Sequence, residues 1–362
     1  MTRRKYNITI HTSRVNGMHS TFSNVAYPKK PYSKSGDEIK VYTQKVVISA
    51  KRNRKYDDDA ILEYKQNSIY QQIFKSLLYI FLSRGKRIKI RSIDIECGSK
   101  IKNIPIEINA QPLEGDFELK YPVPNDVLNV LFEESIKGST LRTATSHYLI
   151  AISTKDRYKR FERLWRSFEQ ISIWHKYHEG RPRLPNDFEV LREMRNYFET
   201  MPHELGHTFN IIDRLNSRDI SKLHWKRMVE NNFPYTGEAR QITNLYDELF
   251  DKNRDVRLVR VYNKIRAIRS SAISAHNRGH DFDTLIQSYL ASKIKNNSHV
   301  LSLIVCKYCY FMRNKMFHGE EADFSFCFTN HTEDDDITDF LNNILTILVN
   351  ELIVGYNVSV QK

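Results

Sequence analysis

The chain has 362 residues, of which 40% are hydrophobic and 12% aromatic, and this composition excludes an intrinsically disordered protein. Lysine and arginine number 56 against 43 aspartates and glutamates, so the formal net charge is +13 at pH 7. This excess favours a polyanionic partner, with nucleic acid as the first expectation and a solvated basic surface as the alternative. The length is sufficient for two domains.

The apolar segments of the chain are too short for a membrane span or a signal peptide. The N-terminal stretch MTRRKYNITIHTSRVNG is charged and has no apolar core of signal-peptide length. The longest apolar stretches, around Leu77–Leu82 and Ile344–Val349, are much shorter than the roughly 20 residues that a spanning helix needs. We therefore expect a soluble, cytoplasmic protein that does not contact a membrane.

The chain contains four cysteines: Cys97, Cys306, Cys309 and Cys327. Such sparse usage suits a reducing compartment and not a disulfide framework. Cys306 and Cys309 form a single CxxC pair, and no second pair occurs at zinc spacing. We interpret these two cysteines as residues that pack within a helix.

Residues 1–121 are predicted to form a mixed domain in which strands predominate. β-Branched or alternating runs predict strands at Ile8–Ile10, Val41–Thr43, Val46–Ile48 and Ile88–Ile95. In the last run the alternation slips by one residue between Ile90 and Ile93, which is typical of a β-bulge. One helix, ending before Gly85, is predicted from apolar residues at helical spacing: Leu62, Ile69, Ile73, Leu77 and Ile80.

Basic residues form three short clusters in this domain: Arg3–Lys5, Lys51–Lys55 and Arg84–Arg87. One cluster of this kind is typical of a solvated surface, whereas three in one domain favour a side that faces RNA. The residues of this domain that we expect to contact RNA are Arg52, Arg54, Lys86 and Arg87.

The segment Tyr121–Asp126 contains two prolines and is the predicted domain boundary, because proline interrupts regular elements. From residue 127 onward the apolar periodicity is helical almost to the C-terminus. Loops interrupt it at Gly180–Pro185, Asn232–Pro234 and His276–His280. The predicted fold class is therefore α+β, with a β-rich N-terminal domain (1–121) followed by an all-α domain (127–362).

One stretch of the helical region, His203-Glu204-Leu205-Gly206-His207, matches the HExxH pattern of zinc peptidases. Two histidines four residues apart on a helix can bind one zinc ion, and the glutamate then acts as a general base on the zinc-bound water. Asp213 follows at the position of a third ligand. A zinc peptidase built on His203, Glu204, His207 and Asp213 is one alternative function, with Zn as its cofactor.

Three features weigh against a zinc peptidase. At this histidine content the five-residue pattern arises by chance at an appreciable rate. Asn210 occupies the place of a glycine in the longer pattern of the metzincins. Pro202, directly before the first histidine, indicates that a helix begins there and does not pass through. A local structural role for these residues is the competing interpretation.

The most informative stretch, Tyr310–Glu320, places Arg313, Asn314 and His318 at the end of a predicted helix. The helix is indicated by apolar residues at helical spacing: Leu301, Ile304, Val305, Tyr308 and Met312. Gly319 is the expected left-handed residue at its end. Arginine binds phosphate through a fixed fork of donors and histidine titrates near neutral pH, so the two suit metal-independent cleavage of a phosphodiester.

The spacing of the arginine and the histidine restricts how they can act together. At about 100° per residue, Arg313 and His318 point about 140° away from each other on an ideal helix. They converge on one phosphate only if the last turn loosens, or if a second helix end brings a symmetric copy.

At Arg313, Asn314 and His318 the chain resembles the HEPN superfamily, whose signature is an arginine, a polar residue that is often asparagine, a short spacer and a histidine. The first long helix of the family is matched by a stripe of Phe161, Leu164, Trp165, Phe168 and Ile171. The closing helix is matched by a stripe of Ile337, Phe340, Leu341, Ile344 and Leu348. The resemblance covers residues 127–362, with a helical insertion at about 180–295.

The resemblance implies a metal-independent endoribonuclease with a composite site made by the motif helices of two protomers. His318 would act as a general base on the ribose 2′-OH or as an acid toward the leaving 5′-oxygen, and Arg313 would bind the phosphate. Asn314 would orient the histidine or the phosphate, and Lys315 is expected to contact RNA. The products would be a 2′,3′-cyclic phosphate and a 5′-hydroxyl, with specificity for RNA over DNA.

The resemblance also implies a third candidate function and a biological role. Some members of the family keep the fold without cleaving RNA and serve as dimerisation or nucleotide-binding modules. Members with an added N-terminal module act as toxins or antiviral effectors when triggered. We therefore expect a homodimer, an RNA partner and an inhibitory or activating partner, with a non-catalytic RNA- or partner-binding module as the alternative.

Overall fold

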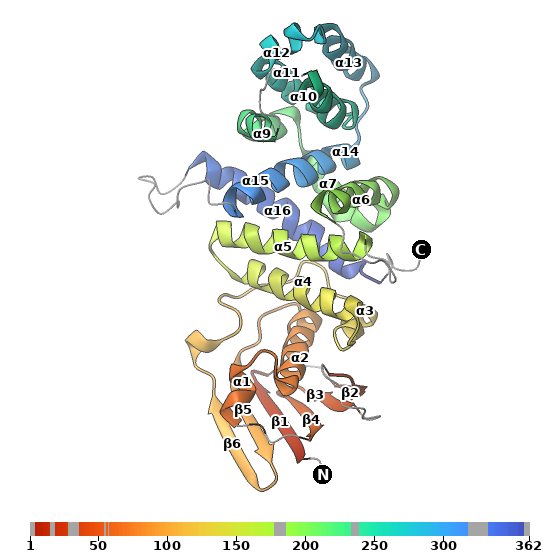
Figure 1. Cartoon of the computed structure of the whole chain (residues 1–362). Helices are drawn as coiled ribbons and strands as arrows, with labels where there is room; N and C mark the ends of the chain where they lie inside the picture. Colours follow the sequence, from red (N-terminus) through yellow and green to blue (C-terminus); the bar gives the residue numbers. More distant parts are fainter. Residues whose placement is uncertain are drawn as a thin grey trace. The chain divides into compact units, whose positions relative to one another are not determined.

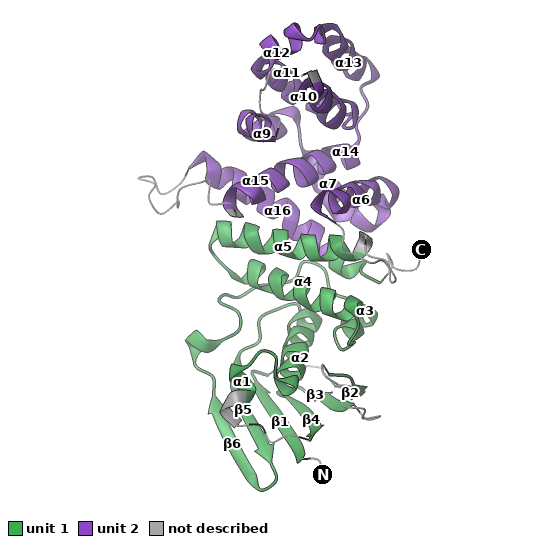
Figure 2. Cartoon of the chain, in the orientation of Figure 1, with its two compact units in different colours: residues 1–174, 352–362 green, residues 175–351 purple. Residues whose placement is uncertain are grey.

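The computed structural model describes residues 4–14, 19–27, 36–53, 56, 58–176, 186–232, 239–317 and 332–357 (Figure 1). The chain divides into two compact units, one of residues 1–174 with 352–362 and the other of residues 175–351 (Figure 2). The first unit holds a six-stranded sheet with helices, and the described elements of the second unit are helical. The predicted α+β class is confirmed.

The predicted boundary at Tyr121–Asp126 coincides with the change from strands to helices, because α3 (Asn125–Val130) begins within it. The first compact unit nevertheless continues through α4 (Ile136–Ser153) and most of α5 (Arg157–Lys176). The reason is that α3 and α4 pack against α2 (Ser68–Arg84), the helix that lies on the sheet. The compact units therefore divide within α5, later than the proline-containing segment.

The sheet is antiparallel throughout, with the strand order β2-β3-β4-β1-β5-β6. Its strands are β1 (Arg4–Thr12), β2 (Ser20–Val25), β3 (Asp37–Val41), β4 (Lys45–Arg52), β5 (Ile90–Cys97) and β6 (Lys100–Pro105). In β1, near the middle of the sheet, Tyr6, Ile8 and Ile10 are fully buried, as expected for period-two alternation. In the edge strand β6 no residue is buried, so the core lies against the inner strands.

The structure confirms the predicted bulge in β5. His11 of β1 pairs with Ser92, and Thr12 pairs with Ile90, so Arg91 is the extra residue between the two pairs. The isoleucines on both sides of the bulge are buried. The extra residue therefore keeps one face of the strand apolar in spite of the slip in its sequence pattern.

The helix α2 accounts for most of the apolar stripe predicted between the strands, and the short α1 (Asp58–Glu63) precedes it. At the start of α2, Asn67 acts as N-cap and accepts a hydrogen bond from the Ile69 N–H at 2.8 Å. The helix ends at Gly85, whose φ of 64° lies in the left-handed region that glycine adopts without steric cost. Its buried face packs near β4.

An ion pair lies buried between α2 and the sheet. The Arg52 guanidinium donates two hydrogen bonds to the Asp37 carboxylate, at 2.7 and 2.6 Å, and both side chains are at most 4% exposed. Arg52 also donates to Ser68 Oγ at 2.8 Å, and Gln72 donates to Asp37 at 2.9 Å. The Tyr27 ring lies 3.7 Å from the guanidinium carbon. The prediction that Arg52 contacts RNA is therefore wrong, because its charge is enclosed and neutralised inside the first unit.

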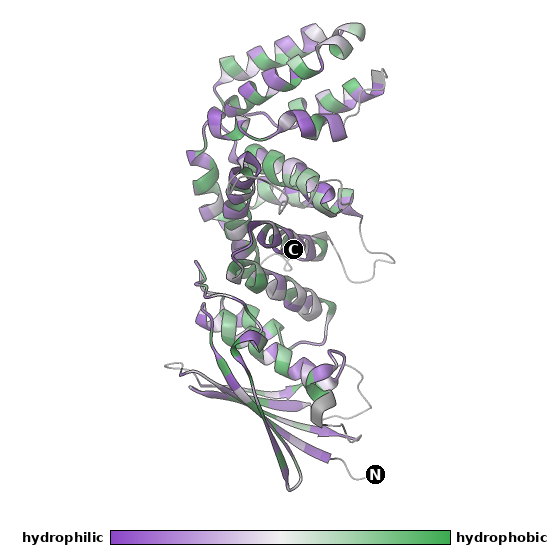
Figure 3. Cartoon of the chain, turned by 90° about the vertical axis from the view of Figure 1, so that its left-hand side faces the viewer, coloured by the Kyte–Doolittle hydropathy of each residue, from purple (hydrophilic) through white to green (hydrophobic). Residues whose placement is uncertain are grey.

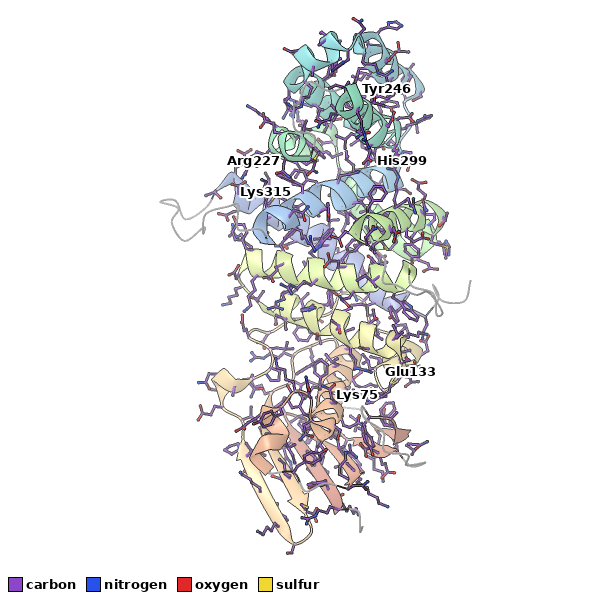
Figure 4. All side chains as sticks on the ribbon, in the orientation of Figure 1. Lys75, Glu133, Arg227, Tyr246, His299 and Lys315 are labelled. Carbon is purple, nitrogen blue, oxygen red and sulfur yellow. The ribbon has the colours of Figure 1, made fainter. Side chains whose placement is uncertain are left out.

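Lys75 of α2 is a second buried cation, and its side chain is fully shielded from solvent (Figure 4). Its Nζ donates to the Ala26 carbonyl at 2.8 Å and lies 2.6 Å from Glu134 Oε1. Burial lowers the pKa of Lys75 to about 8, in spite of the opposing effect of the carboxylate. Arg142 lies 3.4 Å from the same carboxylate oxygen, so Glu134 keeps a cationic partner when the lysine is neutral.

We expect raising the pH from about 8 to about 10 to stabilise the wild-type chain relative to a Lys75→Met variant. The folded chain releases the Lys75 proton near pH 8, whereas the unfolded chain keeps it up to about pH 10.4. Between these values the unfolded state binds more protons, so the free energy of unfolding rises with pH, by on the order of 1–2 kcal/mol. Urea unfolding of both proteins at the two pH values measures this gain, and equal changes in both would contradict it.

The second unit is built from helical segments, most of them short, and the longest of them, α16, ends in the first unit. Their bounds are α6 (Asp187–Thr200), η2 (Pro202–Leu205), α7 (Gly206–Arg214), α8 (Ser217–Ser221), α9 (Trp225–Asn232), α10 (Ala239–Leu245), η3 (Tyr246–Asp251), η4 (Val256–Leu258), α11 (Val259–Ile268), α12 (Ser270–Ala275), α13 (Gly279–Ser292), α14 (Asn297–Ser302), η5 (Leu303–Cys309), α15 (Tyr310–Phe317) and α16 (Glu333–Val354). Hydrophobic and hydrophilic residues alternate along the helices in Figure 3, as expected for amphipathic helices. In the core of this unit, Arg257 donates to Asp255 at 2.7 Å and to the Ile212 carbonyl at 2.7 Å.

The apolar stripes predicted before and after the motif are confirmed as core faces. On α5 the five stripe residues are each at most 1% exposed: Phe161, Leu164, Trp165, Phe168 and Ile171. On α16 four of the five are buried: Ile337, Leu341, Ile344 and Leu348. Among the described helices, α16 alone is long and apolar enough to cross a membrane, by length and composition. Most of its apolar window, 72%, is buried, and core helices of globular proteins meet the same criterion.

Candidate functional site

The predicted helix before the motif runs without interruption through α14, η5 and α15. Its apolar stripe is buried, with exposures of at most 4%: Leu301, Ile304, Val305, Tyr308 and Met312. The middle segment, η5, is π-helical, which the apolar spacing does not predict. π-Helical turns inside α-helices are rare and occur frequently at functional sites.

Arg313 and Asn314 lie side by side on α15, and the structure brings them together as predicted. Arg313 Nη1 donates to Asn314 Oδ1 at 2.9 Å. The same nitrogen lies 3.6 Å from Asp187 Oδ2, and the guanidinium carbon is 5.8 Å from the centre of the Tyr310 ring. The arginine side chain is 20% exposed. It is thus held in one orientation by an amide, a carboxylate and an aromatic ring, with part of its surface open to a ligand.

The carboxylate neighbour of Arg313 was not found from the sequence. Asp187 is the first residue of α6, which begins with a capping box formed by Asn186 and Glu189. Tyr310 also donates to Asp187, at 3.4 Å, across 123 positions of the chain. The residues Asn186–Glu189 carry a helix-start signal, but no local signal places them beside α15.

Lys315 follows on the same helix and lines a hollow of about 320 Å³ with three residues of α9. These residues are Arg227, Glu230 and Asn231. The labelled side chains of Lys315 and Arg227 lie next to each other in Figure 4. The end of the motif helix therefore carries a second basic residue beside Arg313, close to a basic residue of α9.

Several of the sequence predictions fall on residues outside the described ones, namely those for Arg54, His318, Gly319 and Cys327 and for the loop at 180–185. The last described residue of α15 is Phe317. The geometry described above therefore concerns the arginine, the asparagine and the lysine of the motif.

The two remaining basic residues predicted to contact RNA lie just after α2 in the first unit. Lys86 is exposed, and its backbone forms a single β-bridge with Glu118. Arg87 is largely covered, with 13% of its side chain exposed, and lies 3.6 Å from Asp116. Lys86 is thus open to a ligand, whereas Arg87 already has a carboxylate partner.

The HExxH pattern does not assemble a metal site. Residues 202–205 form the 3₁₀ helix η2, and α7 begins only at Gly206, so the two histidines are not on consecutive turns of one α-helix. His203 and His207 are exposed, whereas Glu204 is nearly buried and accepts a hydrogen bond from the Tyr197 hydroxyl at 2.7 Å. The described residues, which include Asp213, contain no group of three histidine, cysteine or acidic side chains placed to hold a metal ion. The described residues therefore give no support to the zinc alternative, and the expected helix start at Pro202 is confirmed, because η2 begins there.

A carboxylate from α16 accepts hydrogen bonds from backbone N–H groups at the junction between η2 and α7. Glu351, which is 7% exposed, accepts hydrogen bonds from the His207 N–H at 2.8 Å and from the Thr208 N–H at 2.9 Å. The Thr208 hydroxyl donates to it at 2.5 Å. These N–H groups belong to the first turn of α7, which has no partners for them within the helix. Glu351 thus caps α7, and a negative charge there is favourable with the helix dipole.

Glu351→Gln is expected to lower the free energy of unfolding by about 1.5–3 kcal/mol, the usual contribution of hydrogen bonds to a charged group. The amide presents its own donors to N–H groups that need an acceptor. Asp213→Asn, on the exposed part of α7, is the matched control and should change stability by no more than about 0.5 kcal/mol. Urea denaturation of the three proteins decides the point, and equal stabilities for both variants would show that the cap contributes nothing.

The CxxC cysteines are packing residues, as interpreted from the sequence. Cys306 and Cys309 lie in η5, are at most 6% exposed and are not joined by a disulfide. Burial raises the pKa of Cys306 to about 12 and that of Cys309 well above its ordinary value. Both thiols are therefore protonated at neutral pH, which is unsuited to metal ligation or nucleophilic attack.

A cleft of about 890 Å³ lies next to the motif helix and was not predicted. It is lined by residues of α6, η3 and η5, and Tyr310 stands at its border with the Arg313 cluster. An ion pair between Lys307 and Glu248 joins the two π-helical segments there. His299, also in this cleft, accepts a hydrogen bond at Nδ1 from the Arg254 N–H at 2.9 Å, and burial lowers its pKa. Its imidazole is therefore neutral at pH 7.

No protein-family model, curated protein or solved structure matches the chain. The function must therefore be argued from the site itself. Of the residues predicted to act on a phosphate, the structure describes Arg313 and Asn314, which are hydrogen-bonded to each other on α15, and Lys315, which lies beside Arg227 of α9.

Proposed function

We propose that the chain is a metal-independent endoribonuclease that cleaves RNA through attack of the ribose 2′-OH. The observation that supports this most is the orientation of Arg313 on α15 by Asn314, Asp187 and Tyr310, five positions before His318 in the chain. Arginine keeps its charge at every physiological pH, and its planar fork matches the oxygens of a phosphate. The Arg313 side chain as a whole is 20% exposed, so part of it can be reached by such a ligand.

In the proposed reaction, His318 removes the proton from the 2′-OH, and the 2′-oxygen attacks the phosphorus. The bond from phosphorus to the 5′-oxygen breaks, and a protonated histidine returns a proton to that oxygen. The products are a 2′,3′-cyclic phosphate and a 5′-hydroxyl. Arg313 binds the charge that develops on the phosphoryl oxygens, and Asn314 holds the guanidinium in place.

The proposal includes a homodimer in which the ends of two motif helices face each other. Arg313 and His318 point about 140° apart on an ideal helix, so one protomer presents them to different sides. A second copy supplies the missing histidine or arginine at each phosphate. Light scattering at the concentration of the cleavage assay measures the state, and a strictly monomeric active enzyme would contradict the composite site.

The proposed biological role is that of a cytoplasmic toxin or antiviral effector that degrades RNA when triggered. This part rests on the family resemblance of the motif. The sheet-containing first unit would sense the trigger or position the RNA, and the exposed Lys86 on that unit is its candidate contact.

The proposed function is tested by incubating the purified protein with total RNA and a tRNA mixture in excess EDTA. We expect cleavage by the wild type and by Glu204→Ala, because neither zinc nor Glu204 takes part. The fragments should carry 2′,3′-cyclic phosphate ends. Cleavage that stops on chelation would contradict the metal-independent mechanism, and absence of cleavage by the wild type would favour a non-catalytic RNA- or partner-binding module.

A further inference from the structure

A strongly basic hollow of about 680 Å³ opens on the second unit, where α8, α9 and α11 meet. Five of its lining residues are basic: Arg218, Lys222, Lys226, Arg260 and Lys264. Glu333 is the one acidic residue among its lining residues. A concave surface lined by charges of one sign concentrates their field and attracts ions of the opposite sign.

The cations of this hollow are poorly neutralised by protein groups. Among the described residues, four of the five basic side chains have no carboxylate within 4.0 Å, the exception being Lys226, whose Nζ is 4.0 Å from Glu230. The Lys264 Nζ donates to the Ser221 carbonyl at 2.7 Å, which orients it without cancelling its charge. On the same helix, by contrast, Arg266 is paired with Asp283 at 2.8 Å. The hollow is thus a local concentration of available positive charge, distinct from the paired surface around it.

The floor of the hollow is rigid because it is part of the packed core. Trp225 and Leu223 line it and are at most 4% exposed. The Trp225 indole N–H donates to the Ile220 carbonyl at 2.8 Å. The cations are therefore presented from three helices that are fixed to one another, which limits the entropy lost when a ligand binds.

The same floor is joined directly to the motif helix. Tyr308 of η5 packs edge-on against Trp225, with 5.3 Å between the ring centres. The Tyr308 hydroxyl accepts a hydrogen bond from the His224 N–H at 3.0 Å. On α9, Lys226 lines the hollow, and the next residue, Arg227, lies beside Lys315. Basic residues thus continue from the hollow, across α9, to the end of α15, and one carboxylate lies along this path, with Asp334 at 3.0 Å from His224 and 3.6 Å from Arg227.

We propose that this hollow binds the phosphate backbone of the RNA substrate and directs the strand toward Arg313. The second part of this inference, that the strand is directed toward Arg313, rests on the proposed function. The recognition itself follows from the charges, because Lys and Arg that neutralise phosphates release the counterions condensed on the nucleic acid. Contacts of this kind position a strand without reading its sequence. The hollow therefore supplies affinity, whereas the bond that is cleaved is selected at α15.

The test measures binding of a fluorescent single-stranded RNA with 2′-O-methyl riboses, which cannot be cleaved by 2′-OH attack. The variant Lys222→Glu/Arg260→Glu reverses two exposed charges of the hollow. The control variant Lys100→Glu/Lys295→Glu makes the same change in net charge at exposed lysines outside it. Anisotropy titrations over a range of salt concentrations give the affinity and its salt dependence for each full-length protein, and circular dichroism checks that each is folded.

We expect the hollow variant to bind at least about tenfold more weakly than the wild type, and its slope of log K against log salt to fall by about 1.4. The control variant should keep the wild-type slope. Equal losses in both variants, or no binding by the wild type, would overturn the inference. The probe cannot be cleaved, so this assay does not depend on nuclease activity. A loss of binding in the hollow variant alone therefore supports RNA binding by the hollow, even if the EDTA assay shows no cleavage. Conversely, if the hollow variant cleaves RNA and binds it with wild-type affinity, the hollow does not bind the substrate, whereas the proposed nuclease function is retained.

Discussion

Replacing His318 with alanine is expected to lower the rate of RNA cleavage by about 10²–10⁴-fold, the usual contribution of a general acid or base. The same variant is expected to remain folded. Single-turnover cleavage of a defined RNA at neutral pH, with thermal unfolding of both proteins, measures the two effects. Wild-type cleavage by a folded His318→Ala protein would contradict the mechanism.

Variants of Arg313, the proposed phosphate-binding residue, and of its neighbour Asp187 give the control for this prediction. Arg313→Lys keeps the charge but loses the planar fork, so its cleavage rate should fall by about 10²–10³-fold. Asp187→Asn removes the negative charge that lies 3.6 Å from Arg313 but keeps a side chain of the same shape beside the guanidinium, so its rate should fall by much less than that of Arg313→Lys. A large loss in Asp187→Asn, equal to that of Arg313→Lys, would show that Arg313 serves the packing of α6 and not the binding of phosphate.

The inner part of the sheet could be predicted from the sequence, and its edges could not. In β1, β4 and β5 most residues of the buried face are β-branched and recur at period two, so the pattern is strong. The edge strand β2 has the sequence STFSNV and a mostly open burial pattern, which carries little apolar signal. The run Val41–Thr43 was predicted as a strand, but β3 ends at Val41, and the Tyr42 N–H donates to the Lys45 carbonyl in a tight turn. β-Branched composition alone does not separate a strand end from the turn that follows it.

The sequence contains a signal that argues against the predicted contact between Arg52 and RNA. Ile48, Ala50 and Arg52 alternate along β4, and the first two are fully or almost fully buried. Period two therefore places the arginine on the inner face. The basic cluster Lys51–Lys55 suggested a common surface, but neighbours in a strand point to opposite faces. The register of the strand decides which side of the sheet a charge occupies, and the number of neighbouring charges does not.

The helix that carries the motif was predictable, and its surroundings were not. The apolar stripe ending at Met312 fixes the buried face, and Arg313 and Asn314 follow from it. The π-helical segment and the position of Asp187 depend on packing between helices that are far apart in the sequence. The cations of the hollow are spaced at least four positions apart in the sequence, on or next to α8, α9 and α11, so they form no run of basic residues. Tertiary structure alone brings them together.

The largest expected effect on stability comes from the buried pair of Arg52 and Asp37. Arg52→Ala should lower the free energy of unfolding by about 3–5 kcal/mol, because it leaves an aspartate at 2% exposure without its counter-charge. Asp37→Ala should have an effect of the same size, since it strands the guanidinium beside Tyr27. Measured by urea unfolding, either loss is a large fraction of the stability of a typical domain.

The double variant Arg52→Met/Asp37→Leu separates the value of the pair from the cost of breaking it. Two apolar side chains of similar volume need no counter-charge, and replacing a buried ion pair in this way is often neutral or stabilising. We therefore expect the double variant to be more stable than either single variant. Ser68 and Gln72 each lose one hydrogen-bond partner in it, which limits the recovery. A double variant as unstable as the sum of the two single variants would show that Arg52 and Asp37 act independently. In that case the hydrogen bonds to α2, and not the ion pair, hold this part of the sheet to the helix.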